Sequence, residues 1–139
     1  MHRFPARALS LALVALVVLV AGCSGSPAGS TAGSTAPAVQ KPAAAAAVGM
    51  LGARTVVDVR TPAEYAAGHI AGAQNIDVQA ADFGARIAAL DKKAPYLVYC
   101  RSGSRSGIAA ATMAAAGFTD IVDGGAMADL VAAGAKTQP

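Results

Sequence analysis

The 139-residue sequence contains no tryptophan, and aromatic residues make up only 4% of it. Any folded domain must therefore build its core from small aliphatic side chains rather than large rings. Charged residues are also scarce, at 14%, and the net charge of +3 includes Arg3 and Arg7 near the N-terminus. Without these two arginines the chain carries nine basic and eight acidic residues, a net charge of +1. Nucleic-acid binding requires a clustered basic surface, so this balance argues against that function.

Cysteine and histidine are nearly absent as well. The cysteines are Cys23 and Cys100, and the histidines are His2 and His69. Two cysteines in an exported protein usually indicate a disulfide, but each has its own explanation below, and we expect no bridge. A single histidine beyond the N-terminal segment is too few for a typical zinc site, so we expect neither a metal nor another cofactor.

The one long apolar run lies at the start of the chain. Residues 9–20 are apolar except for Ser10, follow the two N-terminal arginines, and precede the small residues Ala21 and Gly22. This pattern is typical of a secretory signal peptide. The run is also shorter than the ~20 apolar residues that a membrane-spanning helix needs. We therefore predict a cleaved leader at residues 1–22, with an uncleaved anchor as the alternative.

The residues around the expected cleavage site, Val20-Ala21-Gly22-Cys23, resemble the lipobox of bacterial lipoproteins. The resemblance implies that Cys23 is the lipidated N-terminus and that a lipid anchor holds the protein on a membrane of the cell envelope, outside the cytoplasm. An ordinary signal peptide cut nearby is the alternative. Residues 23–47 are mainly Gly, Ser, Thr, Pro and Ala with one charge, Lys41. We predict that they form a flexible spacer, and that the folded domain covers residues 48–137.

Within that domain, short β-branched or apolar runs alternate with helix-compatible segments. We expect strands at 55–59, 74–78, 96–99 and 119–122, helices beginning near Thr61, Asp82, Ser106 and Met127, and a turn at Gly124-Gly125. The helix starts rest on capping signals: Thr61 and Glu64 are spaced as a capping box, and Asp82 suits an N-cap. Alternation of this kind predicts an α/β fold, a small parallel sheet flanked by helices. In such sheets ligands bind beyond the carboxyl ends of the strands.

Cys100 stands at one such end, directly before the loop Arg101-Ser102-Gly103-Ser104-Arg105-Ser106-Gly107 and a helix-compatible run. Unsatisfied N–H groups at a helix start favour anions, and the two arginines add positive charge. A thiol in this setting ionises more easily than a free cysteine, whose pKa is about 8.5. The pattern predicts a thiolate nucleophile in an anion-binding loop. The alternative is a buried structural cysteine.

Several ordered motifs resemble the single-domain rhodanese family. They are Asp58-Val59-Arg60, Glu64-Tyr65, Gly68-His69-Ile70-Ala71-Gly72-Ala73, Asn75-Ile76, the Cys100 loop, Gly117-Phe118 and Gly124-Gly125. The resemblance implies a rhodanese-like fold in which Cys100 takes sulfane sulfur from a small anionic donor, holds it as a persulfide, and passes it to a thiol or protein-thiol acceptor. The chain departs from the family in two places. Leu130 stands near the position of a frequent tryptophan, and the opening strand and helix are shortened.

The resemblance also assigns roles to single residues. Cys100 is the nucleophile, Arg101 and Arg105 bind the oxyanion of the donor, and Gly103 permits a special backbone geometry. The hydroxyls of Ser102, Ser104 and Ser106 are further donors, although Ser106 is alternatively only an N-cap, and either arginine alternatively faces solvent or holds a neighbouring loop. We expect structural support rather than catalysis from four more residues: ion pairs of Asp58, Arg60 and Glu64, and a loop-fixing hydrogen bond from His69.

Other functions compete with sulfur transfer. Related cysteine phosphatases and arsenate reductases place five residues between cysteine and arginine, whereas four lie between Cys100 and Arg105. The smaller loop favours sulfur over phosphate. A non-catalytic binding module is a second alternative, although the chain keeps both the cysteine and the arginines. A persulfide carrier that serves another protein's thiol is a third.

Overall fold

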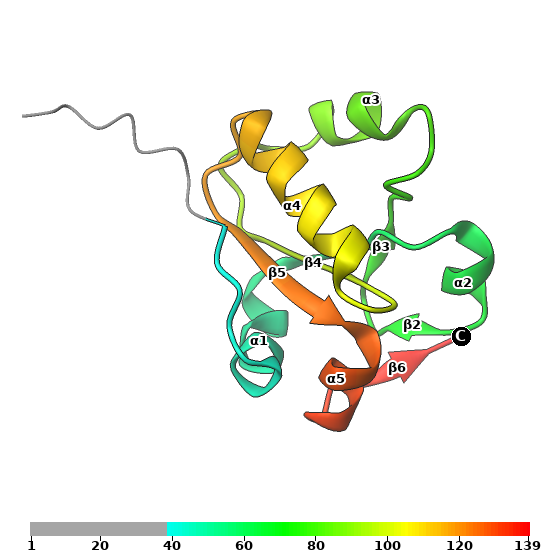
Figure 1. Ribbon diagram of the computed structural model, residues 1–139. Coiled ribbons are helices and arrows are strands. Elements are labelled where there is room, and N and C mark those ends of the chain that lie inside the picture. The colour runs from blue at the N-terminus through cyan, green and yellow to red at the C-terminus, as the bar shows by residue number, and fades with distance from the viewer. Residues whose placement is uncertain (1–38) are drawn as a thin grey trace, which may run out of the picture. The chain divides into compact units, whose positions relative to one another are not determined.

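The computed structural model describes residues 39–139, so the expected leader, Cys23 and most of the expected spacer lie outside the described residues. A four-stranded parallel sheet in the order β3-β1-β4-β5 forms the centre of the domain (Figure 1). Its strands are β1 (Thr55–Asp58), β3 (Gln74–Asn75), β4 (Tyr96–Cys100) and β5 (Ile121–Ala126). The parallel α/β architecture predicted from the sequence is therefore confirmed.

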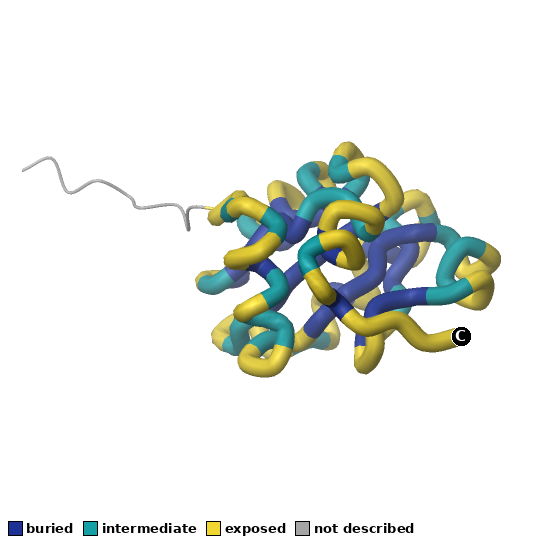
Figure 2. Tube along the Cα trace, turned by 90° about the horizontal axis from the view of Figure 1, so that it is seen from below, coloured by how far each residue is buried: buried dark blue, intermediate teal, exposed yellow. Residues whose placement is uncertain are grey.

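β4 is an interior strand, paired with β1 on one side and β5 on the other, and all five of its residues are buried. Because successive side chains of a strand point to opposite faces, β4 contributes to two cores. Val98 and Cys100 pack into the first cluster, and Leu97 and Tyr99 into the second. Figure 2 shows this buried centre surrounded by exposed segments.

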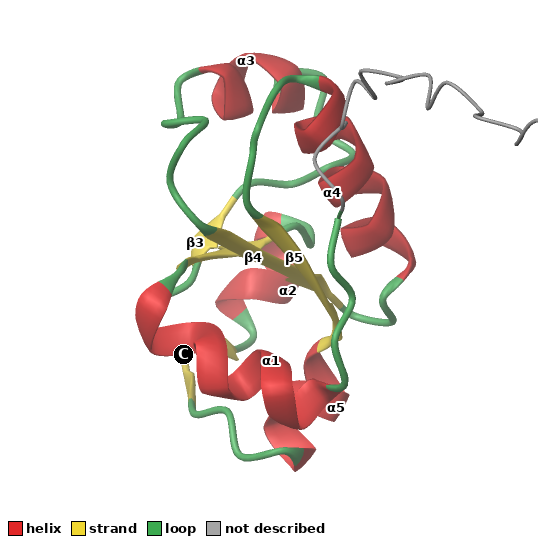
Figure 3. Cartoon of the chain, turned by 90° about the vertical axis from the view of Figure 1, so that its left-hand side faces the viewer, coloured by secondary structure: helices red, strands yellow, loops and turns green. Residues whose placement is uncertain are grey.

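Helices cover both faces of the sheet (Figure 3). α3 (Phe83–Ala88) and α4 (Ser104–Ala115) lie on one face, and α1 (Ala44–Met50) and α5 (Met127–Ala132) on the other. The first core cluster therefore lies between the sheet and the α3/α4 layer, and the second between the sheet and the α1/α5 layer. No helix within residues 39–139 has the length and apolarity needed to cross a membrane.

The capping signals at the helix starts were correct at Thr61 and wrong at Asp82 and Ser106. α2 (Pro62–Ala66) begins with the predicted capping box, in which Thr61 Oγ1 accepts from the Glu64 N–H and Glu64 Oε2 accepts from the Thr61 N–H. Asp82 makes no side-chain cap at α3. Its backbone has φ −92° and ψ 4° instead of the extended conformation that aims an N-cap side chain at the first turn. Ser106 is not an N-cap either, because α4 begins at Ser104, after Gly103.

The expected turn at Gly124-Gly125 is also wrong, because β5 continues through both glycines to Ala126. A register shift between Val98 and Tyr99 accommodates them, and Gly125 adopts φ 76° there. A Cβ on Gly124 would lie 2.8 Å from Leu97 Cδ2, so a larger residue here would require Leu97 or the strand to move. The two glycines thus keep β5 against β4 where the sequence pattern indicates a reversal.

The folded part begins earlier than residue 48, where the sequence places the start of the domain. Gln40 forms a parallel bridge to Val122, and α1 starts at Ala44. Ala47 of α1 is fully buried in the second core cluster. Leu130, which stands near the expected tryptophan position, is fully buried in the same cluster. The sequence gives little sign of this edge, since an alanine-rich stretch resembles both a spacer and a helix.

Three short elements have no counterpart among the sequence predictions. A short 3-10 helix, η1 (Leu51–Ala53), follows α1. β2 (His69–Ile70) pairs antiparallel with β6 (Thr137–Gln138), forming a second, two-stranded sheet. This pairing holds the C-terminal residues of the chain against the loop that follows α2 (Figure 1).

Candidate active site

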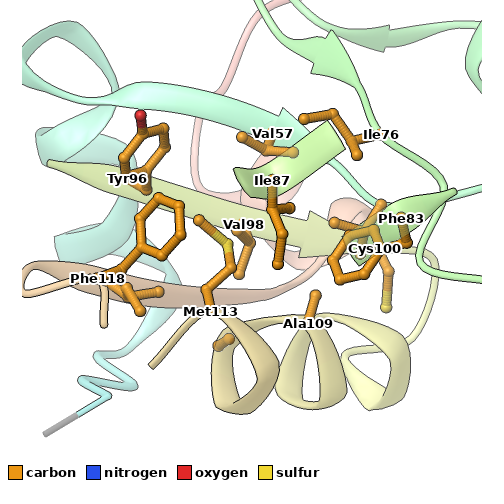
Figure 4. Packing of buried hydrophobic residues seen from close by; sticks show 13 residues of the cluster. Val57, Ile76, Phe83, Ile87, Tyr96, Val98, Cys100, Ala109, Met113 and Phe118 are labelled. Atoms are coloured by element: carbon orange, nitrogen blue, oxygen red, sulfur yellow. The ribbon is translucent and has the colours of Figure 1, made fainter. Parts of the chain in front are cut away.

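Cys100 is the last residue of β4, and its side chain is fully buried. Figure 4 shows it beside Phe83, where the strand passes into the loop before α4. This is the carboxyl end of an interior parallel strand, the edge at which ligands of open α/β sheets bind. Cys100 is a free cysteine among the described residues.

The loop after Cys100 folds back so that its polar groups meet the sulfur. The Gly103 N–H donates to Cys100 Sγ across 3.1 Å, and Ser106 Oγ lies 3.8 Å from the same sulfur. The Ser106 hydroxyl also donates to the Gly103 carbonyl, 3.0 Å away. Ser106 is buried in the first turn of α4, whereas Ser102 in the loop and Ser104 at the helix start are exposed.

These contacts change the acidity of the thiol. Burial raises the pKa of Cys100, because the charged form loses water. Hydrogen bonds from the backbone of Ser106, Ser102 and Gly103 oppose this effect, with help from the Ser106 hydroxyl, and the net pKa lies below the ordinary cysteine value. The site therefore favours a thiolate although the sulfur is out of contact with solvent.

Gly103 makes this geometry accessible. Its φ is 87°, in the left-handed region that residues with a Cβ rarely adopt. A Cβ at this position would also contact the backbone of Gly125, 3.5 Å away at its Cα, so the loop lies directly against β5. The sequence prediction of a special backbone geometry at Gly103 is confirmed.

Arg105 is engaged by the protein itself. Its two terminal nitrogens donate to the two carboxylate oxygens of Glu64, each across 2.7 Å. The hydrogen bonds from Arg105 are the largest cause that lowers the pKa of Glu64 to about 2. Hydrogen bonds from Thr61 lower this pKa further, whereas burial raises it. That Arg105 binds the donor stays a prediction; in the structure its guanidinium is paired with Glu64, whose carboxylate the capping box aims at the loop. This arrangement is the alternative in which one arginine holds a neighbouring loop.

Arg101, in contrast, is exposed and forms no ion pair within residues 39–139. It lines an open groove of about 500 Å³ that we call the α5 groove. The residues of the α5 groove are Arg60, Arg101, Met127, Ala128, Val131 and Ala132. Sequence reasoning singled out the two arginines but missed the groove, because its apolar wall comes from a helix that carries no motif.

Asp58 and Arg60 form a buried ion pair, with Arg60 Nη2 2.6 Å from Asp58 Oδ2. The Tyr99 hydroxyl donates to the same oxygen across 2.7 Å and accepts from the Ile70 N–H. Burial and the Asp58 hydrogen bond raise the pKa of Tyr99 well above its ordinary value. Sequence reasoning missed Tyr99. The available signal was its place in a fully buried strand, since a buried tyrosine hydroxyl needs a polar partner.

His69 lies apart from the thiol and fixes the turn after α2. Its Nδ1 is 3.2 Å from the Tyr65 carbonyl, its Nε2 is 3.0 Å from Gln138 Nε2, and its ring stacks on Tyr65 with centroids 3.7 Å apart. In the part of the chain that the structure describes, no group of three or more His, Cys, Asp or Glu residues is placed to hold a metal ion.

Comparison with known proteins agrees with this geometry. The family model of the rhodanese-like domain matches residues 42–128. Thiosulfate sulfurtransferase GlpE of Pseudomonas fluorescens is 49% identical over 73 residues, which is 50% of this chain and 64% of the relative. The chain thus spans somewhat less than two thirds of the length of that relative.

Solved structures give the same result at the level of the fold. A rhodanese-related protein from Thermoplasma volcanium superposes with a TM-score of 0.62 and 27% identity, over 71% of this chain and 97% of that one. A structure described as rhodanese with anions from E. coli has a TM-score of 0.53 and 29% identity, over 62% and 98%. The match over residues 42–128 contains the strand end, the loop and the helix that surround the buried thiol. The chain therefore belongs to the family of rhodanese-like domains.

Proposed function

We propose that this domain is a sulfurtransferase of the thiosulfate type, with Cys100 as its nucleophile. One observation carries the proposal: the buried Cys100 sulfur accepts the Gly103 N–H at 3.1 Å and has a lowered pKa at the start of a helix. A thiolate held in this way is both nucleophilic and surrounded by donors that stabilise negative charge. The P. fluorescens relative is named a thiosulfate sulfurtransferase, which supports the same chemistry.

In the first half-reaction, the Cys100 thiolate attacks the outer sulfur of thiosulfate. A bond forms between Sγ and that sulfur, the S–S bond of the donor breaks, and its electron pair leaves with sulfite. Cys100 then carries a persulfide whose terminal sulfur is negatively charged. The backbone N–H groups of the loop that face Sγ stabilise this anion as they stabilise the thiolate. Arg101 provides the positive charge for the oxyanion of the donor.

In the second half-reaction, a thiolate acceptor attacks the terminal sulfur of the persulfide. The acceptor gains the sulfur, and the electron pair of the broken bond returns to Cys100 as thiolate. No oxidant or reductant is consumed, and neither half-reaction requires a side chain to donate a proton to the leaving group. The Glu64 carboxylate, which is bound to Arg105, is therefore not needed as an acid.

Intact-mass measurement of the purified protein after incubation with thiosulfate tests the proposal. We expect the gain of one sulfur atom and release of one sulfite, both lost in Cys100→Ala. Cys100→Ala is sterically mild, because the variant removes only the sulfur from a buried position. Hydrolysis of an aryl phosphate without any sulfur adduct would instead support the phosphatase alternative and rule out sulfur transfer.

We also propose that the domain acts at the cell envelope on a lipid anchor at Cys23. The support is the leader and lipobox-like sequence, which lie outside the described residues. Fractionation of cells that produce the Cys23→Ala variant tests this: we expect release from membranes or accumulation of an unprocessed precursor. Unchanged processing and unchanged membrane association would exclude the anchor.

A further inference from the structure

We infer that Asp123 is a positioning residue for sulfur transfer, because its carboxylate holds the Gly125 backbone against the Cys100 loop. This inference rests on the proposed function and adds to it a residue that acts on the thiol only through its neighbours. Three observations carry it: the burial of the carboxylate, the hydrogen bond that it accepts from Gly125, and the contacts of Gly125 with the loop.

Asp123 is a buried carboxylate within β5. Only 3% of the residue is exposed, and it pairs with Val98 of β4. Its Oδ2 lies 3.1 Å from Lys41 Nζ, and a Cβ on Gly107 would lie 3.7 Å from the same oxygen, so the carboxylate lies beside the first turn of α4. A charged group is costly to bury unless its oxygens are bound. Core packing alone therefore does not explain an aspartate at this strand position.

The other carboxylate oxygen fixes the irregular part of β5. Asp123 Oδ1 accepts a hydrogen bond of 3.0 Å from the Gly125 N–H, two residues further along the strand. This bond spans Gly124, where the pairing with β4 shifts by one residue, since Val98 pairs with Asp123 and Tyr99 with Gly125. An aspartate bound to a backbone N–H two residues on holds the chain in a turn-like conformation, and Gly125 has a φ of 76° here. The carboxylate therefore determines where the Gly125 peptide lies.

Gly125 in turn contacts the two residues that bind the sulfur. A Cβ on Gly103 would lie 3.5 Å from the Gly125 Cα, and the Ser106 hydroxyl lies 3.4 Å from the Gly125 carbonyl oxygen. The Gly103 N–H donates to Cys100 Sγ, and Ser106 Oγ is 3.8 Å from the same sulfur. Movement of the Gly125 peptide would therefore shift both groups relative to the thiol. Asp123 is connected to Cys100 through Gly125 and these two residues.

Position and charge are two ways in which Asp123 can act on the thiol, and they predict opposite effects. The charged groups nearby are Lys41, which faces Asp123, and Arg105, which is bound by Glu64 and whose pKa is raised in part by the charge of Cys100. Removing a negative charge near a thiol lowers its pKa, whereas loosening the N–H groups that bind the thiolate raises it. Because burial and hydrogen bonds set the pKa of Cys100, we expect the effect of position.

Two variants of Asp123 distinguish these effects. Asp123→Asn keeps an oxygen that can accept the Gly125 N–H but removes the charge, and Asp123→Ala removes both. The rate at which iodoacetamide alkylates Cys100 is measured in the full chain from pH 5 to 10, with peptide mass spectrometry to separate Cys100 from Cys23. Sulfite release from thiosulfate is measured over the same pH range. Circular dichroism melts of each variant identify a temperature at which all of the proteins are folded.

We expect Asp123→Ala to raise the midpoint of both pH profiles by about one unit and to slow sulfite release at pH 7 by up to about tenfold. Asp123→Asn should retain the midpoint of the unsubstituted protein. Asp91→Ala is the matched control, because Asp91 Oδ1 accepts the N–H of Lys93 two residues further on in the same way, at 2.9 Å. That bond lies before the start of β4, at the opposite end of the strand from Cys100, so this variant should leave both midpoints unchanged.

Three results would overturn the positioning role while sulfur transfer stands. A lower midpoint in both Asp123 variants would show that the charge acts on the thiol, and an equal rise in both would show that the hydrogen bond to Gly125 is not the cause. An unchanged midpoint in Asp123→Ala would leave Asp123 with a structural role only. If the unsubstituted protein releases no sulfite from thiosulfate, the proposed function fails, whereas the alkylation profiles still report whether Asp123 holds the Cys100 loop.

Discussion

At Cys100, burial and hydrogen bonding act on one sulfur in opposite directions. Full burial alone would keep the thiol protonated and inert. The backbone N–H groups of the loop reverse that effect, so the pKa of Cys100 falls below its ordinary value while the sulfur stays shielded from solvent. This combination suits a persulfide, which also carries a negative charge and which water and oxidants would otherwise reach.

The lowered pKa of Cys100 predicts the pH dependence of sulfur loading. The reactive form is the thiolate, so the rate rises as pH increases through the pKa and is constant above it. Because that pKa is lowered, the midpoint should lie below the value of about 8.5 for a free cysteine. Stopped-flow measurement of sulfite release from pH 5 to 10 would show it. A midpoint at or above that of a free thiol contradicts the proposed role of the loop.

Several residue assignments followed from the sequence because they depend on local spacing. Thr61 and Glu64 of the capping box are only three positions apart, and the left-handed Gly103 follows from a short loop between a strand and a helix. The partner of Arg105 did not follow, because Glu64 lies 41 residues away in the chain. A loop sequence shows which side chains carry charge, but only the packing of α2 against the loop shows which charges are already paired.

At the scale of elements, the pair Glu64–Arg105 joins α2 to the first turn of α4 beside the thiol. Both side chains are only partly exposed, at 28% and 21%. The guanidinium fork that would suit an oxyanion is occupied by a carboxylate, so Glu64 competes with an anionic donor for Arg105. This competition predicts that weakening the pair improves the binding of thiosulfate.

The Glu64→Gln variant tests the competition. The glutamine carbonyl can still accept from the Thr61 N–H, so the helix cap is kept while the negative charge is removed. We expect KM for thiosulfate to fall roughly fivefold, the equivalent of about 1 kcal/mol, with little change in kcat. Steady-state kinetics measure this, and Thr61→Ala is the control that loses the cap but not the charge. A rise in KM would show instead that Glu64 positions Arg105 for the donor.

Strand β5 shows why element boundaries were harder to predict than elements. Two consecutive glycines are typical of a turn, yet here they allow a register shift against β4 and a close approach of the Gly103 loop. The tight contacts come from Leu97 and Val98 on the neighbouring strand. Two glycines in the sequence indicate that the backbone conformation is unusual at this position. Whether the chain turns there or continues as a strand depends on its contacts with the neighbouring strand.

Gly124→Ala should therefore destabilise the domain. The new Cβ would lie 2.8 Å from Leu97 Cδ2 and 3.2 Å from the Val98 carbonyl oxygen, so the strand or the leucine must move. Overpacking of this kind costs about 1–3 kcal/mol, and thermal unfolding should shift down by roughly 4–8 °C for each kcal/mol. Gly84→Ala in α3 is the matched control, because no heavy atom lies within 4 Å of its new Cβ and alanine favours a helix. An unchanged Tm in Gly124→Ala would contradict the tight packing of β5.

At the scale of the whole molecule, the sequence predicted the parallel α/β order but not where the fold begins. Strand and helix periodicity is a local property, and it identified β1, β4, α4 and α5. The first residues of the fold are different, because an alanine-rich segment has no periodicity. Their structure depends on contacts with β5 and α5, which come more than 70 residues later.

The first residues of the fold, 40–47, make three kinds of contact with β5 and the second core cluster. The Gln40 N–H donates to the Ile121 carbonyl, the Asp123 N–H donates to the Gln40 carbonyl, and Lys41 pairs with the buried Asp123 carboxylate at 3.1 Å. Ala47 of α1 is fully buried in the same region. A protein that begins at residue 48 loses all of these contacts and leaves the Asp123 charge without a cation.

We therefore predict that a chain beginning at residue 39 unfolds in one cooperative transition, and that a chain beginning at residue 48 is much less stable. The two backbone hydrogen bonds alone contribute about 2 kcal/mol, and the buried face of α1 adds apolar contact. At 4–8 °C for each kcal/mol, the Tm should fall by about 10 °C or more. Circular dichroism melts of the two chains measure the difference, and sulfur loading from thiosulfate reports whether the Cys100 loop survives. Equal melting temperatures would mean that α1 and Gln40 are dispensable and that the domain starts where the sequence pattern placed it.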